Sequence, residues 1–372
     1  MRYAVREVSN RQEFRQFYQF QNRLFRDCPT YVPSLDTDQK QTLSHSPCLD
    51  YCRQKLFLCY DETGHVAGRC CAIINPRYND LYSTSRMRFG WTDFVEDFEA
   101  ARALIEAAEN WGRSQGMTEI HGPLGYNTMY KQGLVVEGFY SVPQSNNLYN
   151  PSYYPEYLEQ MGFEKEADWL QYRFAVDQPV PERIGHLADT LLRRYDLHVA
   201  DVNRLKKDKG LTARFFEEYN ASFAGVRNFI PLTEKEIAAE GKEYVGRLDG
   251  DTSCILLDAD GSIAAFAICF PSLSTALQKA GGRLFPTGWW HLLRAQKHYE
   301  TVDMLLVGVS PKWEDRGLTA ILHDHLHRRW QSQGVRYAIS NPQYEDNAAL
   351  KIWEGYPDKE LYIRRRVYIK PL

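Results

Sequence analysis

The sequence predicts an α/β protein in which one unit of mixed sheet and helices is used twice. Apolar residues follow a strand–helix–strand pattern in each half of the chain, and the elements come in the same order in both halves. The strand, helix and strand are expected at Met87–Phe94, Glu99–Gln115 and Glu119–His121, and again at Met304–Val309, Leu318–Gln331 and Tyr337–Ser340. A repeat of this length indicates a fold-sized unit that occurs twice.

The length of the chain agrees with two domains. It has 372 residues, and domains commonly have 100 to 200. Pro179 and Pro181 interrupt the pattern near the middle, and proline breaks regular elements. We therefore expect an N-terminal domain over residues 1–178 and a C-terminal domain over residues 179–372.

The elements expected in the first half follow from local sequence patterns. A strand, a helix and a hairpin are expected at Tyr3–Arg6, at Gln12–Phe25, and at Leu56–Tyr60 with Val66–Ile74. Asp61–Gly64 supplies the hairpin turn. The helix after the next strand has Ala101, Leu104, Ile105 and Ala108 on one face, and Gly116 ends it. Residues Gly122–Asn147 are rich in Gly, Asn and Pro and are expected to form a long loop, which in a compact domain is usually functional or mobile.

The second half repeats this order after a first helix at Glu182–Arg194. Helices are expected at Leu211–Phe223 and Thr233–Ala239, where Thr233 and Glu236 form a capping box. Ser253–Leu257 and Ser262–Phe270 form a second hairpin. Hairpins are antiparallel and strand–helix–strand crossovers are parallel, so each sheet should be mixed, mostly antiparallel and flanked by helices.

Composition excludes several classes of function. The net charge is −3, so no general attraction to nucleic acid is expected. No apolar run is long enough to cross a bilayer, and Met1–Asn10 does not resemble a signal peptide. Eight cysteines in a chain this long do not indicate a disulfide framework, so a reduced cytoplasmic setting is expected. His45, Cys48 and Cys52 lack the spacing and fourth ligand of a zinc site, so no metal is predicted.

The turn between strand and helix is the first candidate site. Backbone N–H groups at a helix N-terminus favour phosphate. In the second half this turn contains Val309, Ser310 and Pro311, then Arg316, Gly317 and Thr319. Glu314 and Asp315 lie between them, and these two acids would weaken phosphate binding unless they point to solvent.

These residues resemble the GNAT superfamily of acetyl-CoA-dependent N-acetyltransferases, which have a Val-x-Pro strand end and a glycine-containing turn before the main helix. Over nearly its full length the chain is also similar to a group of bacterial proteins with two fused GNAT-like halves. The matching pieces include Tyr31–Val32–Pro33, Gly68–Arg69, Gly122–Pro123, Tyr149–Asn150–Pro151, Leu284–Phe285–Pro286 and Glu345–Asp346–Asn347. Some members of that group are N-acyltransferases that acylate a sphingoid base.

The resemblance implies a donor, acetyl-CoA or a longer acyl-CoA, and residues that hold it. The backbone of Leu306, Val307 and Val309 would polarise the thioester carbonyl. Arg316, Gly317, Leu318 and Thr319 would bind the pyrophosphate. Glu345, Asp346 and Asn347 are the side-chain candidates for proton transfer, although Asp346 or Asn347 could instead only cap the following helix. Many GNAT enzymes have a tyrosine six residues after this Asn, where the chain has Trp353, and an indole cannot protonate a thiolate.

The first half resembles an inactive copy. Its turn contains Glu96, Asp97 and Glu99 and neither glycine nor a basic residue, so it should repel pyrophosphate. We expect this half to shape the acceptor groove, which Tyr149, Tyr153, Tyr154 and Tyr157 would line unless they are packing residues. His323, His325 and His327 alternate on the main helix of the second half. They are expected to be partly exposed and cannot form one metal site.

The segment Arg283–Tyr299 mixes tryptophans with basic residues. This composition fits a peripheral contact with the inner membrane, an entrance for a lipid chain, or a helix packed between the halves. Together with the resemblance, the sequence predicts an acyl-CoA-dependent N-acyltransferase that acts on a primary amine, and the resemblance favours a lipid-type amine such as a sphingoid base. The alternatives are acetylation of a small soluble amine and a catalytically inactive GNAT-like protein that binds a ligand or partner.

Overall fold

The computed structural model describes residues 3–200, 202–203, 209–241 and 245–372. It contains two compact units, and each is assembled from segments of both halves of the sequence. Unit 1 comprises Met1–Trp169, Leu273–Arg294 and Ile363–Leu372, and unit 2 comprises Leu170–Ser272 and Ala295–Tyr362. These units differ from a simple division of the chain between residues 178 and 179.

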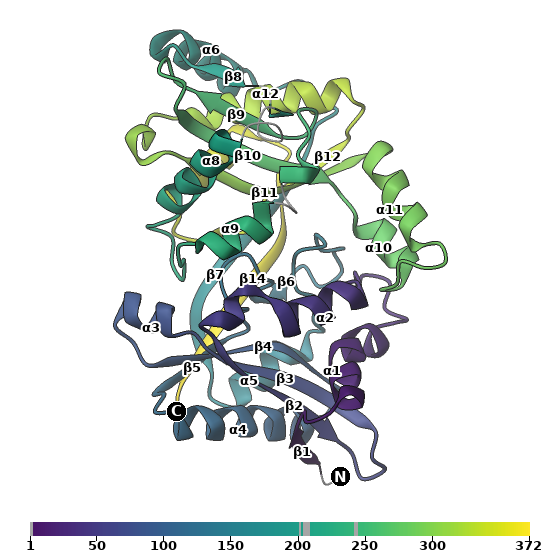
Figure 1. The fold of residues 1–372 in the computed structure, drawn as a ribbon. Coiled ribbons are helices and arrows are strands. Elements are labelled where there is room, and N and C mark those ends of the chain that lie inside the picture. Colours follow the sequence, from purple (N-terminus) through teal and green to yellow (C-terminus); the bar gives the residue numbers. More distant parts are fainter. Residues whose placement is uncertain (1–2, 201, 204–208, 242–244) are drawn as a thin grey trace. The chain divides into compact units, whose positions relative to one another are not determined.

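Unit 1 is a mixed sheet flanked by helices (Figure 1). Its strands are β1 (Ala4–Glu7), β2 (Arg53–Tyr60), β3 (Val66–Ile74), β4 (Arg86–Phe94), β5 (Glu119–Gly122), β6 (Leu134–Glu137) and the C-terminal part of β14 (Glu360–Pro371). Its helices are α1 (Arg11–Leu24), α2 (Asp36–His45), η1 (Pro47–Asp50), α3 (Pro76–Tyr82), α4 (Phe98–Ser114), α5 (Tyr153–Gln160) and α10 (Ser274–Ala280). The strand order is β1-β2-β3-β4-β5-β14, β6 pairs with β14, and only β4 and β5 run parallel among these pairs.

Helix α4 shows how the predicted pattern produces the fold of unit 1. Its apolar stripe is buried as predicted and packs against β3. The buried members include Ala101, Leu104, Ile105 and Ala108. Gly116 follows the helix with φ = 76°, a conformation that side chains other than glycine rarely adopt, so it ends the helix as expected.

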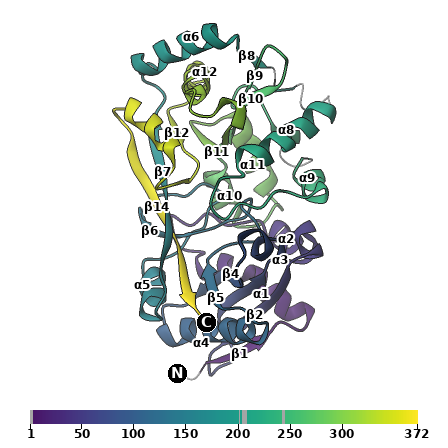
Figure 2. The same ribbon diagram turned by 90° about the vertical axis from the view of Figure 1, so that its left-hand side faces the viewer.

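Unit 2 repeats this architecture (Figure 2). Its strands are the C-terminal part of β7 (Glu164–Ala175), β8 (His198–Ala200), β9 (Cys254–Leu257), β10 (Ile263–Pro271), β11 (Thr301–Val309), β12 (Tyr337–Ile339) and β13 (Gln343–Tyr344). Its helices are α6 (Glu182–Tyr195), α8 (Lys209–Ser222), α9 (Glu234–Glu240), η3 (Pro311–Trp313), α12 (Leu318–Ser332) and η4 (Ala348–Gly355). The order is β7-β12-β11-β10-β9-β8, β13 pairs with β7, and β11 and β12 are parallel. Helix α11 (Gly288–Lys297) begins in unit 1 and ends in unit 2.

The last strand of each half completes the sheet of the other unit. Residues Arg173–Ala175 of β7 pair with β12 in unit 2, and residues Tyr368–Pro371 of β14 pair with β5 in unit 1. Strand β14 also pairs with β6, which lies inside the segment Gly122–Asn147 that was expected to be only a loop. That expectation was wrong because the partner of β6 is more than two hundred residues away in the sequence, beyond the reach of any local pattern.

The main helix of unit 2, α12, is covered by other parts of the chain. Helix α6 packs against it (Figure 2), and both helices contribute to one apolar core. The rings of His323 and His327 pack against Phe174 and Tyr356 and are buried, 5% and 1% exposed. His325 is partly exposed, so the expectation of partial exposure was wrong for the first two histidines. Burial lowers the pKa of His323 to about 4, so its imidazole is neutral at pH 7. These histidines belong to the core.

Candidate active site

The parallel strands β11 and β12 of unit 2 pair over a short distance and then separate. The ladder joins Thr301 to Tyr337, Val302 to Ala338 and Asp303 to Ile339. Strand β11 continues to Val309, whereas β12 ends at Ile339. The edge of β11 beyond Asp303 is therefore not covered by β12.

A β-bulge lies just past the point of separation. In the ladder with β10, Leu306 is opposite Ile268 and Met304 is opposite Cys269, so Leu305 is the extra residue. The backbone N–H of Ser310 donates to the carbonyl of Ala264 at 2.9 Å. Residues opposite each other alternate between bonded and non-bonded pairs in an antiparallel ladder.

That alternation shows which of the three predicted backbone residues bond to β10 and which do not. Leu306 belongs to a pair that is hydrogen bonded to β10, whereas Val307 and Val309 direct their N–H and C=O groups away from β10. Across the described part of unit 2, no backbone segment is hydrogen bonded to Val307 or Val309 on that side. Val307 and Val309 are thus the residues of this set that offer backbone groups to a ligand.

Asp303 lies at the last pair before the strands separate, and the sequence reasoning missed it. Its side chain is 3% exposed, and Oδ1 has no hydrogen-bond partner among the described residues. Burial raises the pKa of this carboxyl to about 7, although a hydrogen bond with Ser272 partly opposes the shift. A buried carboxyl that titrates near neutral pH is a candidate acid or base. A carboxylate inside an otherwise apolar strand was the sequence feature that could have revealed it.

The turn after β11 leaves the first helical N–H groups of α12 without a side-chain cap. Gly317 is the N-cap residue, with φ = 76°, and no side chain caps the helix. Arg316 is exposed and lies over the rings of Trp313 and Tyr195, 5.1 and 5.6 Å from their centroids. Thr319 is half-buried. The arrangement suits an anion at the helix N-terminus, next to a fixed guanidinium.

Three residues near this turn refine the prediction. Leu318 is 1% exposed and belongs to the core of unit 2, so only its backbone can face a ligand. Glu314 and Asp315 are both exposed, which reduces the repulsion they would exert on a bound pyrophosphate because water screens their charges.

The predicted side chains at 345–347 lie at the start of the 3₁₀ helix η4. Asn347 caps that helix, since its Oδ1 accepts from the N–H of Ala349 at 2.8 Å. Asp346 is exposed and forms an ion pair with Arg227 at 3.5 Å. Glu345 is also exposed. Of the two residues that could cap this helix, Asn347 therefore does so.

Trp353 is a core residue. It is 2% exposed, and its indole N–H donates to Gln343 Oε1 at 2.6 Å. Its ring packs against Phe174 and Tyr356, with centroids 5.3 and 5.8 Å away. The indole therefore stabilises the packing of η4 in unit 2.

In unit 1 the parallel strands β4 and β5 also separate, but other residues of the chain form hydrogen bonds in the space between them. The parallel ladder ends where Arg88 pairs with His121, the position that Asp303 and Ile339 take in unit 2. The N–H of Leu124 donates to the carbonyl of Phe89 at 2.8 Å. Arg88 donates from Nη1 to the carbonyls of Gly125 and Tyr126 at 3.0 and 3.1 Å.

The end of β4 is also covered. Tyr154 is 1% exposed, and its hydroxyl lies 2.7 Å from the N–H of Phe94 and 3.0 Å from the Phe94 carbonyl, which also accepts from Tyr153. Tyr154 is therefore a packing residue, whereas Tyr153 is half-buried and bonds to the backbone of β4. The N-terminus of α4 is capped by Asp97, whose Oδ1 accepts from the N–H of Glu99 at 2.9 Å. A carboxylate thus occupies the place that would receive phosphate.

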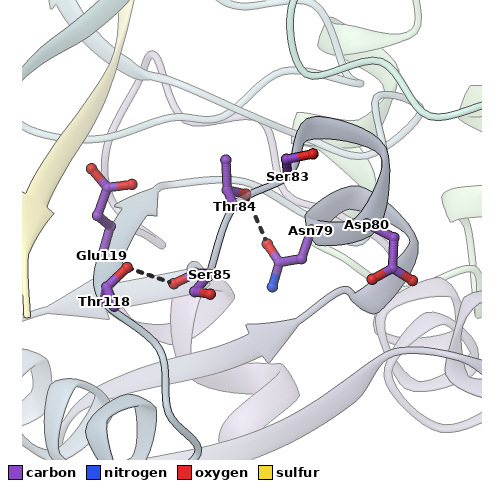
Figure 3. Close-up of a pocket in the computed structure, with 7 residues that line it drawn as sticks. All are labelled: Asn79, Asp80, Ser83, Thr84, Ser85, Thr118 and Glu119. Carbon is purple, nitrogen blue, oxygen red and sulfur yellow. Dashed lines mark hydrogen bonds between the residues drawn. The ribbon is translucent and has the colours of Figure 1, made fainter.

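A hollow of 640 Å³ in unit 1 lies away from this region (Figure 3). It is lined by Asn79, Asp80, Ser83, Thr84, Ser85, Thr118 and Glu119. Ser85 and Thr118 immediately precede β4 and β5, so the hollow is at the opposite end of these strands from their point of separation. Several of its polar groups bond to one another, as Thr84 does to Asn79 at 3.2 Å.

Neither a membrane-spanning helix nor a metal-binding cluster occurs among the described residues. No helix in this part of the chain is long and apolar enough to cross a membrane. No group of three or more His, Cys, Asp or Glu side chains in the same part of the chain is arranged to hold a metal ion.

Comparisons with known proteins agree with this architecture. No family model matches the chain. Protein YghO of Escherichia coli (strain K12) is 26% identical over 317 residues, 83% of this chain and 79% of that protein. The bacterial ceramide synthase of Caulobacter vibrioides (strain NA1000 / CB15N) is 25% identical over 323 residues, 84% and 81% of the two chains.

Solved structures show the fold. A tandem GNAT protein from the clavulanic acid biosynthesis pathway has a TM-score of 0.59 at 12% identity and covers 100% of this chain and 98% of its own. A GCN5-related N-acetyltransferase from Sphaerobacter thermophilus has a TM-score of 0.56 at 12% identity, with 99% and 95% covered. The repeated unit, the separated parallel strands and these neighbours lead to one conclusion: the chain is a two-domain protein with the tandem GNAT fold.

Proposed function

We propose that unit 2 transfers an acyl group from acyl-CoA to a primary amine. The observation that carries the proposal is the position of Asp303. A carboxyl whose pKa is raised to about 7 lies where β11 and β12 separate, next to the bulge at Leu305. A thioester that lies along the edge of β11 would bring its carbonyl carbon close to this carboxyl.

The two ends of this edge suit the two ends of the donor. The strand from Leu305 to Val309 spans about 13 Å, since each residue advances the chain by about 3.3 Å. The uncapped helix start at Gly317 and the exposed guanidinium of Arg316 provide a place for the pyrophosphate at one end. Val307 and Val309 would bond to the arm of CoA, and the bulge would face the thioester.

The reaction needs a group that accepts a proton from the ammonium form of the amine. In this proposal the Asp303 carboxylate takes that proton, and the free amine attacks the thioester carbonyl. A C–N bond forms and the C–S bond breaks. The second N–H proton goes to the departing thiolate, which leaves as the thiol, and the first proton is released to solvent.

Glu345, Asp346 and Asn347 remain candidates for contact with the acceptor. Tyr344, which precedes them, donates to the carbonyl of Arg227 at 3.0 Å, so these residues lie beside the connection between α8 and α9. The exposure of Glu345 and Asp346 suits binding of a charged ammonium more than a deep role in proton transfer.

The acceptor that we propose is a lipid-type amine such as a sphingoid base. The similarity to a protein named bacterial ceramide synthase supports this choice, because it extends over 84% of the chain. A small soluble amine as acceptor, with acetyl-CoA as donor, is the alternative.

Calorimetry and a transfer assay test the proposal. The purified protein is titrated with acetyl-CoA and palmitoyl-CoA, and each donor is then incubated with sphinganine or with a small soluble amine. Palmitoyl transfer to sphinganine that depends on Asp303 would support the lipid reaction, and acetyl transfer to the soluble amine would replace it.

Two results would contradict the proposed reaction. Saturable acyl-CoA binding without transfer to any amine would indicate an inactive, ligand-binding GNAT fold. Absence of acyl-CoA binding would remove the donor itself. The variants Glu345→Gln and Asn347→Ala, compared with Asp303→Asn, then show which side chains the reaction requires.

A further inference from the structure

Helix α11 and the loop before it expose large apolar side chains. Phe285 is 77% exposed, Trp289 45%, Trp290 49% and Leu293 52%. The described residues include eight exposed large hydrophobic side chains, and these four fall within positions 285–293. Scattered apolar side chains on a surface are ordinary, but a concentrated group indicates an interaction surface.

The exposed apolar side chains lie on one side of α11, and the segment before this helix is held by hydrogen bonds. Gly288, His291, Leu292 and Ala295 on the other side are buried or half-buried, at the spacing of a helical face. The preceding segment is tied to unit 1, since the carbonyl of Gly282 accepts from the N–H of Asp36 at 2.9 Å. Helix α10 is also held there. Its Ser274 donates to the carbonyl of Pro143 at 2.8 Å, and its Gln278 donates to the carbonyl of Pro29 at 2.8 Å.

The same surface is basic. Arg283, Arg294 and Lys297 are exposed, and the sequence has no acidic residue between Asp260 and Glu300. The whole chain has a net charge of −3, so this is a local departure from its general charge. The guanidinium of Arg294 lies 5.8 Å from the centroid of the Trp290 ring. Basic and aromatic groups are thus interleaved.

We propose that this surface docks on an anionic lipid bilayer. Phe285, Trp289, Trp290 and Leu293 would enter the interfacial region of the bilayer, and Arg283, Arg294 and Lys297 would lie against the lipid phosphates. Tryptophan and phenylalanine favour this region because their rings are apolar and polarisable, and basic side chains are attracted to the negative surface potential.

The combination of basic and apolar side chains on this surface favours an anionic bilayer over a protein partner. A protein partner would need a complementary acidic and apolar face of fixed shape, whereas an anionic bilayer supplies both properties to any convex helix. Docking does not depend on the proposed reaction, but it would bring the chain to the surface where a lipid amine resides.

Vesicle sedimentation without acyl-CoA tests the proposal. The full chain is mixed with vesicles of phosphatidylcholine alone, or of phosphatidylcholine with phosphatidylglycerol. Binding should be stronger to the anionic vesicles and should weaken with salt. The double variant Trp289→Ser and Trp290→Ser should bind about tenfold more weakly, and Arg294→Glu should weaken binding to anionic vesicles by about tenfold.

Matched variants separate docking from general loss of apolar surface. Leu187 on α6 and Tyr140 are 44% and 96% exposed and lie outside this surface, so Leu187→Ser and Tyr140→Ser should bind vesicles like the parent chain. Thermal unfolding of each variant checks that it is folded. Equal binding to both vesicle types, equal losses in the control variants, or no binding would overturn the proposal. Dimers that disappear in the tryptophan variant, without vesicle binding, would assign the surface to a second copy instead.

Discussion

In unit 1 the backbone beyond the β4–β5 ladder is bonded to the chain's own residues, whereas in unit 2 the matching edge of β11 is left available. The ladder in each unit has three parallel pairs. At the last pair unit 1 has Arg88, which holds the carbonyls of Gly125 and Tyr126, and unit 2 has Asp303, whose Oδ1 has no partner among the described residues.

The N-termini of the helices that follow, α4 and α12, also differ in whether the chain's own side chains bond to them. In unit 1 the N-terminus of α4 is capped by Asp97, and in unit 2 the N-terminus of α12 starts at Gly317 without a side-chain cap. In unit 1 the chain's own residues thus bond to these polar backbone groups. In unit 2 the described residues leave the backbone groups of Val307 and Val309 without such a partner, as the proposed donor site requires. The difference shows how a duplicated fold can retain its frame while only one copy keeps the features of a binding site.

The largest effect is expected from substituting the residues at the ends of the two parallel ladders, Asp303 in unit 2 and Arg88 in unit 1. Asp303→Asn should lower kcat/KM for acyl transfer by about 10³-fold, because an amide cannot accept the proton of the ammonium. In the parent protein kcat/KM should rise as pH passes about 7, the value to which burial raises the Asp303 pKa. The assay is the rate of thiol release as a function of pH.

The matched control is Arg88→Gln, which should leave kcat/KM within about twofold once the folded fraction is taken into account, since general acid–base groups act only within hydrogen-bond reach. Equal losses in both variants would mean that Asp303 acts only through the fold.

The next effect concerns stability and has a definite sign. The pKa of Asp303 is raised from 3.8 to about 7, so between these values the native state holds more protons than the unfolded state. Stability of the parent protein should therefore fall as pH rises through this window. Asp303→Asn removes the penalty, and the variant should be more stable above pH 7 by up to about 4 kcal/mol. Thermal unfolding at pH 4 and pH 8 measures the gap, which should be near zero at the lower pH. A gap that does not grow with pH would contradict the raised pKa.

A third test compares basic residues at the starts of the two helices. Arg316→Glu should weaken CoA binding by about tenfold, because it replaces an attractive charge beside the pyrophosphate by a repulsive one. The control is Arg102→Glu on α4, which is also exposed and should leave the affinity unchanged. Calorimetric titration measures both. Similar losses in the two variants would indicate a general charge effect and not a site in unit 2.

The smallest effect is expected at the cap of α4. Asp97→Ala should lower the free energy of unfolding by about 1 kcal/mol, since the side chain accepts from the N–H of Glu99. Asp97→Asn retains an acceptor and should lose less. Neither variant should bind CoA in unit 1, because Leu124, Tyr153 and Tyr154 still occupy the backbone of β4. Titration with CoA would reveal a second binding event if this comparison is wrong.

Part of the candidate site could be predicted from sequence because its parts are neighbours along the chain. The residues from Val309 to Thr319 are consecutive, and glycine at position 317 is needed for a backbone with φ = 76°. Asp303 was missed because its role depends on burial and on the end of a ladder with β12. Its partner in that ladder, Ile339, is separated from it by the whole of α12.

By itself the sequence determined the repeat, the helices and the strands with strong periodicity, since each depends on residues close together in the chain. Tertiary structure alone decided that β7 completes the sheet of unit 2 and β14 that of unit 1, that Phe174 and Tyr356 pack against His323 and His327, and that burial raises the pKa of Asp303. Strand pairing, burial and desolvation depend on residues that are far apart in the sequence, so a local sequence pattern cannot predict them.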